Sequence, residues 1–232
     1  MILAATLQER LYRAFIYDDR YKLYFQGLGN TLLIAFLATL IGVAIGVVLA
    51  MINYVSKKTG KLKVLSAISK TYIMIIRGTP VVLQLFIMYF VVLASSNNGI
   101  AIGALTFGLN SGAYVAEIIR SGIMSIDAGQ MEAGRSLGLS YATTMKCVII
   151  PQAFKNVLPA LGNELITLLK ETSIVTVIGL KDLTKGAMII QGKTYQAIVP
   201  FLAIAAIYLA MVMILTTVLG RLERRMRKND QR

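Results

Sequence analysis

The feature that most constrains this fold is a run from Thr31 to Ile52 that contains no charged side chain. A helix needs about 20 predominantly apolar residues to cross a bilayer, so this run is long enough to span one. Four further apolar runs follow, over Pro80–Ala94, Ile100–Ile119, Pro151–Leu169 and Ala197–Leu219. These runs are longer than barrel strands and lack their alternation of apolar and polar residues. Because only helices and closed barrels span a bilayer, the runs are expected to be helices. We therefore predict an all-α integral membrane protein with about five transmembrane helices, the fourth being the least apolar.

Composition excludes most other classes. Hydrophobic residues make up 56% of the 232 residues and charged residues only 15%, whereas soluble domains average about 45–50% and about 25%. The chain has no histidine, which excludes Ser–His triads and His-ligated zinc. Its one cysteine, Cys147, excludes an intrachain disulfide framework. No Gly-x-x-x-x-Gly-Lys-Ser/Thr segment occurs, so the sequence predicts neither an ATPase nor another enzyme.

The distribution of positive charge predicts the orientation. With five spans and a cytoplasmic C-terminus, sixteen of the 24 Lys and Arg residues fall in inner segments. The positive-inside rule then places the N-terminus outside and the C-terminus in the cytoplasm. We divide the chain into an amphipathic segment over 1–23, a transmembrane permease domain over 24–225 and a basic cytoplasmic tail over 226–232. The first segment is expected to place Leu3, Leu7, Leu11, Ala14 and Phe15 on one face.

The loop over residues 127–150, between the third and fourth predicted spans, carries helix signals. Asp127 is a plausible N-cap, Gly138 breaks the helix that it begins, and a second short helix is expected after Ser140, as far as Pro151. Two short helices here form a rigid cytoplasmic element. Such an element either receives force from a separate ATPase or only orients the neighbouring spans, and periodicity leaves both alternatives open.

Three segments resemble a known family. The loop resembles the EAA loop of ABC importer permeases, with Glu132-Ala133-Gly134 (alanine is usual at the third position), then Gly138, Val148, Ile150 and Pro151 at matching spacings. Arg77-Gly78-Thr79-Pro80 followed by Gln84 resembles a segment of polar amino acid permeases, and residues 110–123 resemble their third-span motif. The chain is thus similar to ABC importer permeases for polar amino acids over about residues 22–225.

The resemblance implies a set of partners in a bacterial plasma (inner) membrane. A second permease subunit, identical or related, pairs with the first around a central pathway. Two ABC ATPase subunits bind ATP and Mg²⁺, so this chain itself needs no cofactor. An extracytoplasmic substrate-binding protein delivers the amino acid, and no nucleic acid is involved. On this chain the resemblance places Glu132, Ala133, Gly134 and Gly138 on the cytoplasmic coupling helix that docks on the ATPase.

Polar residues within the apolar runs are candidates for substrate binding. A carboxylate at membrane depth costs roughly 2.5 kcal/mol or more, so Glu117 and Glu164 are expected to face a cavity or a partner. Asn110, Tyr114 and Glu117 share one helical face through their i, i+4, i+7 spacing. We add Asn163 as the neighbour of Glu164, which is the leading candidate for the substrate's ammonium group or a basic side chain.

The break at Gly78 and Pro80 supplies candidates for the substrate carboxylate. Both residues interrupt a helix, and a new helix beginning near Pro80 offers free backbone N–H groups to an anion. Gly78 and Thr79 are the leading candidates, with Arg77 and Gln84 beside them.

Structural roles for these residues remain open at this stage. Glu117 can pair with Arg120, Glu164 with Lys155 or Lys170, and Arg77 can anchor at the inner interface. The small-xxx-small pairs Gly42/Gly46, Gly99/Gly103 and Gly108/Gly112 permit close helix packing.

Alternative functions are an ion-gradient-driven secondary transporter and, less favoured, an intramembrane enzyme. The acidic residues slightly favour a basic substrate, but the sequence does not distinguish arginine, lysine, histidine, glutamine and cystine.

Overall fold

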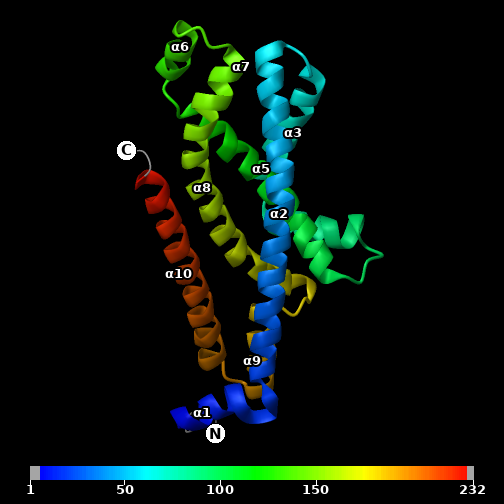
Figure 1. Cartoon of the computed structure of the whole chain (residues 1–232). Helices are drawn as coiled ribbons and strands as arrows, with labels where there is room; N and C mark the ends of the chain where they lie inside the picture. Colours follow the sequence, from blue (N-terminus) through cyan, green and yellow to red (C-terminus); the bar gives the residue numbers. More distant parts are fainter. Residues whose placement is uncertain (1–5, 229–232) are drawn as a thin grey trace.

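The computed structural model describes residues 6–228, whose regular elements are all helices, with no strand among them (Figure 1). The predicted all-α class is confirmed. Leu3 and residues 229–232 of the predicted tail lie outside the described residues. The elements are α1 (Leu7–Leu11), η1 (Tyr12–Ile16), η2 (Tyr17–Asp19), α2 (Tyr21–Thr59), α3 (Lys63–Gly78), α4 (Val81–Ile87), η3 (Met88–Val92), α5 (Gly99–Met124), α6 (Ala128–Ser136), α7 (Tyr141–Thr144), η4 (Met145–Ile149), α8 (Ile150–Glu171), η5 (Thr172–Ile178), α9 (Leu183–Thr194) and α10 (Ile198–Lys228).

Helices α2 and α5 form the centre of the bundle, and glycines let them approach closely. A Cβ added at Gly46 would lie 2.4 Å from Cγ1 of Val115, and one at Gly112 would lie 2.7 Å from Cγ2 of Ile45. The glycines of each helix therefore receive side chains of the other, as small residues do at membrane helix interfaces. The predicted glycine spacing thus serves packing within the chain.

Three described helices are long and apolar enough to cross a membrane: α2, α5 and the Ile198–Met226 part of α10. A fourth span results if α3 and Val81–Val92 count together, but these are bent by 108°. The predicted second span over Pro80–Ala94 is therefore shorter than expected, since Val81–Val92 alone rises about 18 Å. Helix α8, the fourth predicted span, does not qualify because charged and amide side chains interrupt its apolar residues. The count of five spans is not confirmed.

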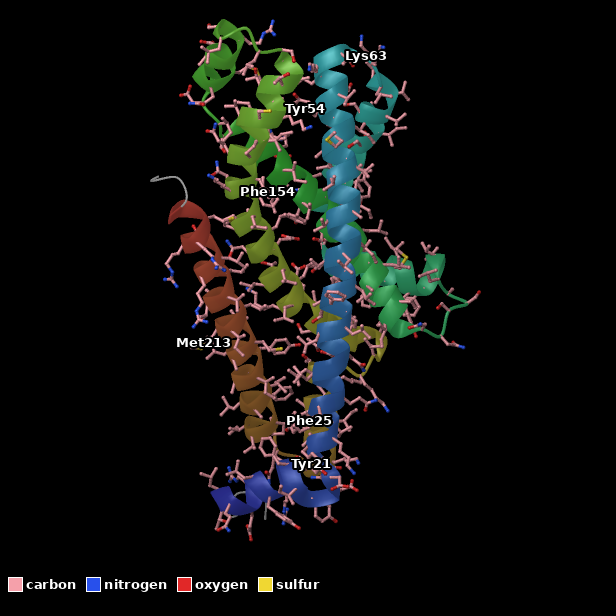
Figure 2. The ribbon with its side chains drawn as sticks, in the orientation of Figure 1. Tyr21, Phe25, Tyr54, Lys63, Phe154 and Met213 are labelled. Atoms are coloured by element: carbon pink, nitrogen blue, oxygen red, sulfur yellow. The ribbon has the colours of Figure 1, made fainter. Side chains whose placement is uncertain are left out.

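The two ends of the bundle carry different segments. Figure 1 shows α1, the start of α2 and α9 at one end, and α6, α7 and the ends of α2 and α10 at the other. The segments that the charge count assigned to opposite sides thus lie at opposite ends. Much of the surface between them is apolar: Phe25, Phe154 and Met213, labelled in Figure 2, are more than half exposed.

The amphipathic segment meets the bundle through its later residues. Ala14 is buried, and the ring of Phe15 stacks on that of Tyr24 with centroids 5.2 Å apart. Leu7 and Leu11 are exposed. The single apolar face expected from the spacing is divided, because the α-helical turn of α1 gives way to the π-helical turn η1.

Candidate functional site

The break between α3 and α4 is closed by a glutamine side chain. Where α3 ends, its last carbonyls lose their helical partners. Gln84 Nε2 donates to the carbonyl of Ile76 at 2.8 Å and to the hydroxyl of Thr79 at 2.8 Å. The Thr79 hydroxyl itself donates to the carbonyl of Ile75 at 2.9 Å. The bend is therefore held by side chains that were predicted to bind substrate.

Two residues of helix α5 also contact the residues around this break. Asn110, which is buried, donates from Nδ2 to Gln84 Oε1 at 2.9 Å. One helical turn later, the guanidinium carbon of Arg77 lies 5.2 Å from the ring centroid of Tyr114, a cation–π distance. The structure therefore brings together five predicted site residues, since Thr79 bonds to Gln84, the amides of Gln84 and Asn110 bond to each other, and the exposed Arg77 lies over the ring of Tyr114.

Glu117 forms an ion pair with Arg120, which was the structural alternative to a role in substrate binding. Arg120 Nε donates to Glu117 Oε2 at 2.9 Å, and Nη2 donates to the other carboxylate oxygen. Glu117 also lines a hollow of about 490 Å³ together with Arg77 and Tyr114. The side chain of Arg120 is half exposed, so the ion pair is not buried.

Glu164 has a neutral partner instead of a cation. Ser111 Oγ on α5 donates to Glu164 Oε1 on α8 at 2.9 Å. No ion pair to Lys155 or Lys170 is formed within the described residues, and Glu164 is partly buried. Asn163 is exposed on α8. Ser111 was not among the predicted residues, although it stands between two that were quoted, Asn110 and Gly112.

The loop after α5 has the local geometry that its sequence predicts. Asp127 caps α6, its Oδ1 accepting from the N–H of Gly129 at 2.6 Å. Gly138 has φ +80, a left-handed conformation that suits glycine, and Ser140 caps α7. The second helix does not end at Pro151, since α7, η4 and α8 follow one another without a break. The π-helical turn η4 ends at Ile149, two residues before Pro151, and proline cannot donate a helical hydrogen bond.

Two of the residues predicted to contact the ATPase are exposed on the surface of α6. Glu132 and Ala133 are exposed, and Leu137 at the end of the helix is 81% exposed. Gly134 is buried: a Cβ there would lie 2.4 Å from Cγ2 of Thr144. Within the described residues its close approach is therefore to α7 of the same chain. Leu137 was missed, and its apolar side chain in a polar loop was the available signal.

Comparison with known proteins now decides the family. Residues 42–228 match the family described as "Binding-protein-dependent transport system inner membrane component". The chain belongs to this family. It is a multi-pass transport component of the bacterial inner membrane.

Two curated relatives and one solved structure are similar over most of their length. The "Arginine transport system permease protein ArtQ" of Bacillus subtilis is 41% identical over 208 residues, 88% of this chain and 93% of ArtQ. The "Putative glutamine transport system permease protein GlnP" of Rickettsia bellii is 38% identical over 199 residues, 84% and 89% of the two chains. A structure described as an amino acid ABC transporter with histidines has 42% identity and a TM-score of 0.83, covering 96% of this chain and 99% of its own.

Proposed function

We propose that this chain is the transmembrane permease subunit of an ATP-driven ABC importer for a polar amino acid, with a basic one favoured. The observation that carries the proposal is the exposed, capped helix α6, which projects between two bundle helices of a chain belonging to a binding-protein-dependent family. ATP and Mg²⁺ are bound by a separate ATPase, and an extracytoplasmic binding protein delivers the substrate. The curated relatives supply the substrate class, since their names specify arginine and glutamine.

Helix α6 is the proposed coupling helix. Its exposed Glu132 and Ala133, followed by Leu137, present a small surface of one carboxylate and apolar groups. Gly134 fixes α6 against α7, and α7 continues into α8. A force applied to α6 by an ATPase is thus transmitted to a bundle helix through packed backbone. The turn at Gly138 sets the angle between the two helices.

The coupling assignment is tested by Glu132→Lys in the complex with its ATPase partner, reconstituted in liposomes. Truncating a buried charge at an interface costs about 2–5 kcal/mol, so we expect ATPase binding to weaken about 30-fold or more. Gln8→Lys, which adds a lysine on exposed α1 at the opposite end, serves as the control and should bind normally. Normal ATPase binding and uptake by Glu132→Lys would refute the assignment.

The substrate assignment centres on Glu164. A carboxylate at depth is costly unless a cation or a cavity compensates it. Ser111 supplies one hydrogen bond, which leaves most of the acceptor capacity of the carboxylate for an ammonium or guanidinium group. The exposed break at Arg77, Gly78 and Thr79 is the proposed partner of the substrate carboxylate. Asn163, Tyr114 and Glu117 complete the proposed path, while Gln84 and Asn110 hold its geometry.

Uptake of two substrates distinguishes the possible roles of Glu164. If Glu164→Gln lowers arginine uptake and spares glutamine uptake, the carboxylate binds the basic side chain. If both fall, it binds the α-ammonium group common to both. The same carboxyl-to-amide change at Glu223 on α10 controls for loss of charge. Unchanged uptake of both substrates shows that Glu164 is structural and that the substrate binds elsewhere.

A second permease subunit is also proposed, paired across the exposed apolar faces of the bundle. Helix α10 contributes much of this surface, with Leu202, Leu209 and Met213 each about 60% exposed. Crosslinking of single cysteines placed on α10 in the Cys147→Ala chain tests this pairing, and only monomers after oxidation would contradict it.

A further inference from the structure

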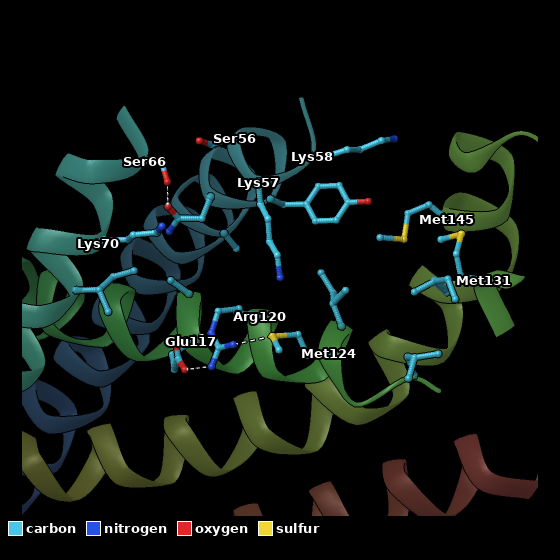
Figure 3. Close-up of a pocket in the computed structure, with 18 of the residues that line it drawn as sticks. Ser56, Lys57, Lys58, Ser66, Lys70, Glu117, Arg120, Met124, Met131 and Met145 are labelled. Atoms are coloured by element: carbon cyan, nitrogen blue, oxygen red, sulfur yellow. Dashed lines mark hydrogen bonds and ion pairs between the residues drawn. The ribbon is translucent and has the colours of Figure 1, made fainter. Parts of the chain in front are cut away.

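A large cleft lies at the same end of the bundle as α6 and α7, and it shares Glu117 with the hollow beside Arg77 and Tyr114. Its volume is about 890 Å³, and it is bounded by the ends of α2 and α5, by α3, and by α6 and α7 (Figure 3). Tyr54 and Tyr141 join two of its walls through a 2.7 Å hydrogen bond between their hydroxyls. Asn53 fastens α2 to α3 by bonding to Ser66 and Ser69, both at 2.9 Å.

The cleft carries more positive than negative charge. Four cationic side chains line it, Lys57 and Lys58 from α2, Lys70 from α3 and Arg120 from α5, against the two carboxylates of Glu117 and Asp127. Both carboxylates are engaged, since Glu117 pairs with Arg120 and Asp127 caps α6. Lys58 is also engaged, because its Nζ lies 3.5 Å from the ring centroid of Tyr141.

Lys57 and Lys70 remain without a counter-ion. Within the described residues neither forms an ion pair or a side-chain hydrogen bond, and Figure 3 shows Lys57 pointing into the cleft above Arg120. Both residues are exposed, so their ammonium groups are accessible from the cleft and would attract an anion placed between them. The two ammonium groups therefore favour an anionic occupant.

The remaining walls of the cleft are apolar. Ile73 and Ile123 line it together with the methionines Met74, Met124, Met131 and Met145, whose flexible side chains adapt to irregular shapes. Met74 is also 68% exposed, so the cleft is continuous with the outer face of α3. That face exposes Val64, Ile68 and Ile75, each by more than half. The cleft thus opens sideways onto a surface suited to hydrocarbon.

We propose that this cleft binds one anionic glycerophospholipid from the leaflet next to α6 and α7. Its phosphate lies between Lys57 and Lys70, and its acyl chains follow the isoleucines and methionines out to the face of α3. A soluble anion matches only the two lysines and an apolar peptide only the walls, whereas an anionic lipid matches both. Basic pockets between membrane helices bind anionic headgroups in the same way. The proposal concerns a lipid and does not depend on the substrate assignment.

The test measures lipid retention by the purified transporter complex in detergent. Native mass spectrometry counts bound dioleoyl phosphatidylglycerol during titration, with dioleoyl phosphatidylcholine as the zwitterionic comparison. Each lysine near a membrane surface contributes enough for removal of both to weaken binding about 30-fold. We therefore expect that loss for the double variant Lys57→Gln/Lys70→Gln. The control Lys61→Gln/Lys63→Gln removes two exposed lysines that do not line the cleft and should retain the lipid.

Two further measurements on the unmodified protein keep the proposal open to refutation if the double variant fails to assemble. A phosphatidylglycerol with a photoreactive acyl chain should label Met74, Met124 or Met131, and labelling elsewhere alone would overturn the proposal. Millimolar inorganic phosphate should leave the lipid in place, and its displacement of the lipid would indicate a site for free anions. Equal retention by the double variant, or equal binding of phosphatidylcholine, would also overturn it.

Discussion

Two glycines two residues apart on α2 allow a sharp test of how α9 is held against the bundle. A Cβ added at Gly27 would lie 2.6 Å from the carbonyl oxygen of Asp182, 2.7 Å from Cα of Leu183 and 2.8 Å from the carbonyl carbon of Asp182. All three are backbone atoms, so no rotamer change relieves the overlap. A Cβ at Gly29 meets nothing within 4 Å. Comparing an alanine at Gly27 with an alanine at Gly29 therefore separates the effect of close packing on stability from the effect of helix propensity.

The size of the effect follows from these distances. Ordinary van der Waals contact begins near 3.4 Å, so Gly27→Ala must displace the segment before α9 by about 0.7 Å. That displacement strains the bonds from Asn30 to the Lys181 carbonyl and from Leu183 N–H to the Thr31 hydroxyl. Overpacking of this kind costs about 1–3 kcal/mol. Alanine in place of glycine favours a helix by about 0.5–1 kcal/mol at either site, so this gain cancels in the comparison.

We expect Gly27→Ala to be about 1–3 kcal/mol less stable than Gly29→Ala, which corresponds to a difference in Tm of about 2–12 °C. Thermal unfolding in detergent, followed by circular dichroism, measures the difference, and SDS titration gives an independent midpoint. Gly29→Ala should match or slightly exceed the unsubstituted chain. Equal midpoints for the two alanine variants would refute the argument, because they would show that the segment before α9 yields freely.

Three further predictions concern polar contacts. Gln84→Ala leaves the amide of Asn110 and a carbonyl at the end of α3 without a partner, so unfolding in SDS should be easier by about 1–3 kcal/mol, and an unchanged midpoint would contradict this. Asp182→Ala removes a buried side chain and its two 2.9 Å capping bonds from the start of α9 and should cost about 0.5–2 kcal/mol, with Asp182→Asn less affected in the same assay. Lys193 lowers the pKa of the exposed Asp18 carboxyl below its ordinary value of 3.8. The stability that this pair adds is therefore complete above that pH and lost as pH falls through the lowered pKa. Asp18→Asn should be less stable than the unsubstituted chain at pH 6 and equal to it in strong acid, and a difference that persists in strong acid would contradict the assignment.

The features that the sequence predicts correctly are set by neighbours along the chain. The helix start at Asp127 and the turn at Gly138 depend on side-chain and backbone preferences within a few residues, and both are present. The apolar run Thr31–Ile52 correctly indicates a spanning helix, but α2 extends from Tyr21 to Thr59. Hydropathy detects the residues that face hydrocarbon, whereas the helix continues wherever its backbone bonds persist.

The features that the sequence does not predict depend on contacts between distant segments. The hydrogen bond of Ser111 with Glu164 joins residues 53 positions apart, and that of Gln84 with Asn110 joins residues 26 apart. A buried carboxylate or amide signals that a partner exists, but its residue type gives no indication of which helix supplies that partner. The 108° bend between α3 and α4 likewise depends on Gln84 bonding across the break.

The hydrogen bonds within the chain divide the predicted site residues into two groups with different expected behaviour. The amides of Gln84 and Asn110 bond to each other and to the end of α3, so a substrate could engage them only by breaking bonds that hold the bend. Glu164 has one neutral partner and acceptor capacity to spare. We therefore expect Gln84→Ala to lower the unfolding midpoint in proportion to its loss of uptake, and Glu164→Gln to lower uptake at an unchanged midpoint. If Gln84→Ala instead loses uptake without losing stability, the amide contacts substrate directly and the bend is held by packing alone.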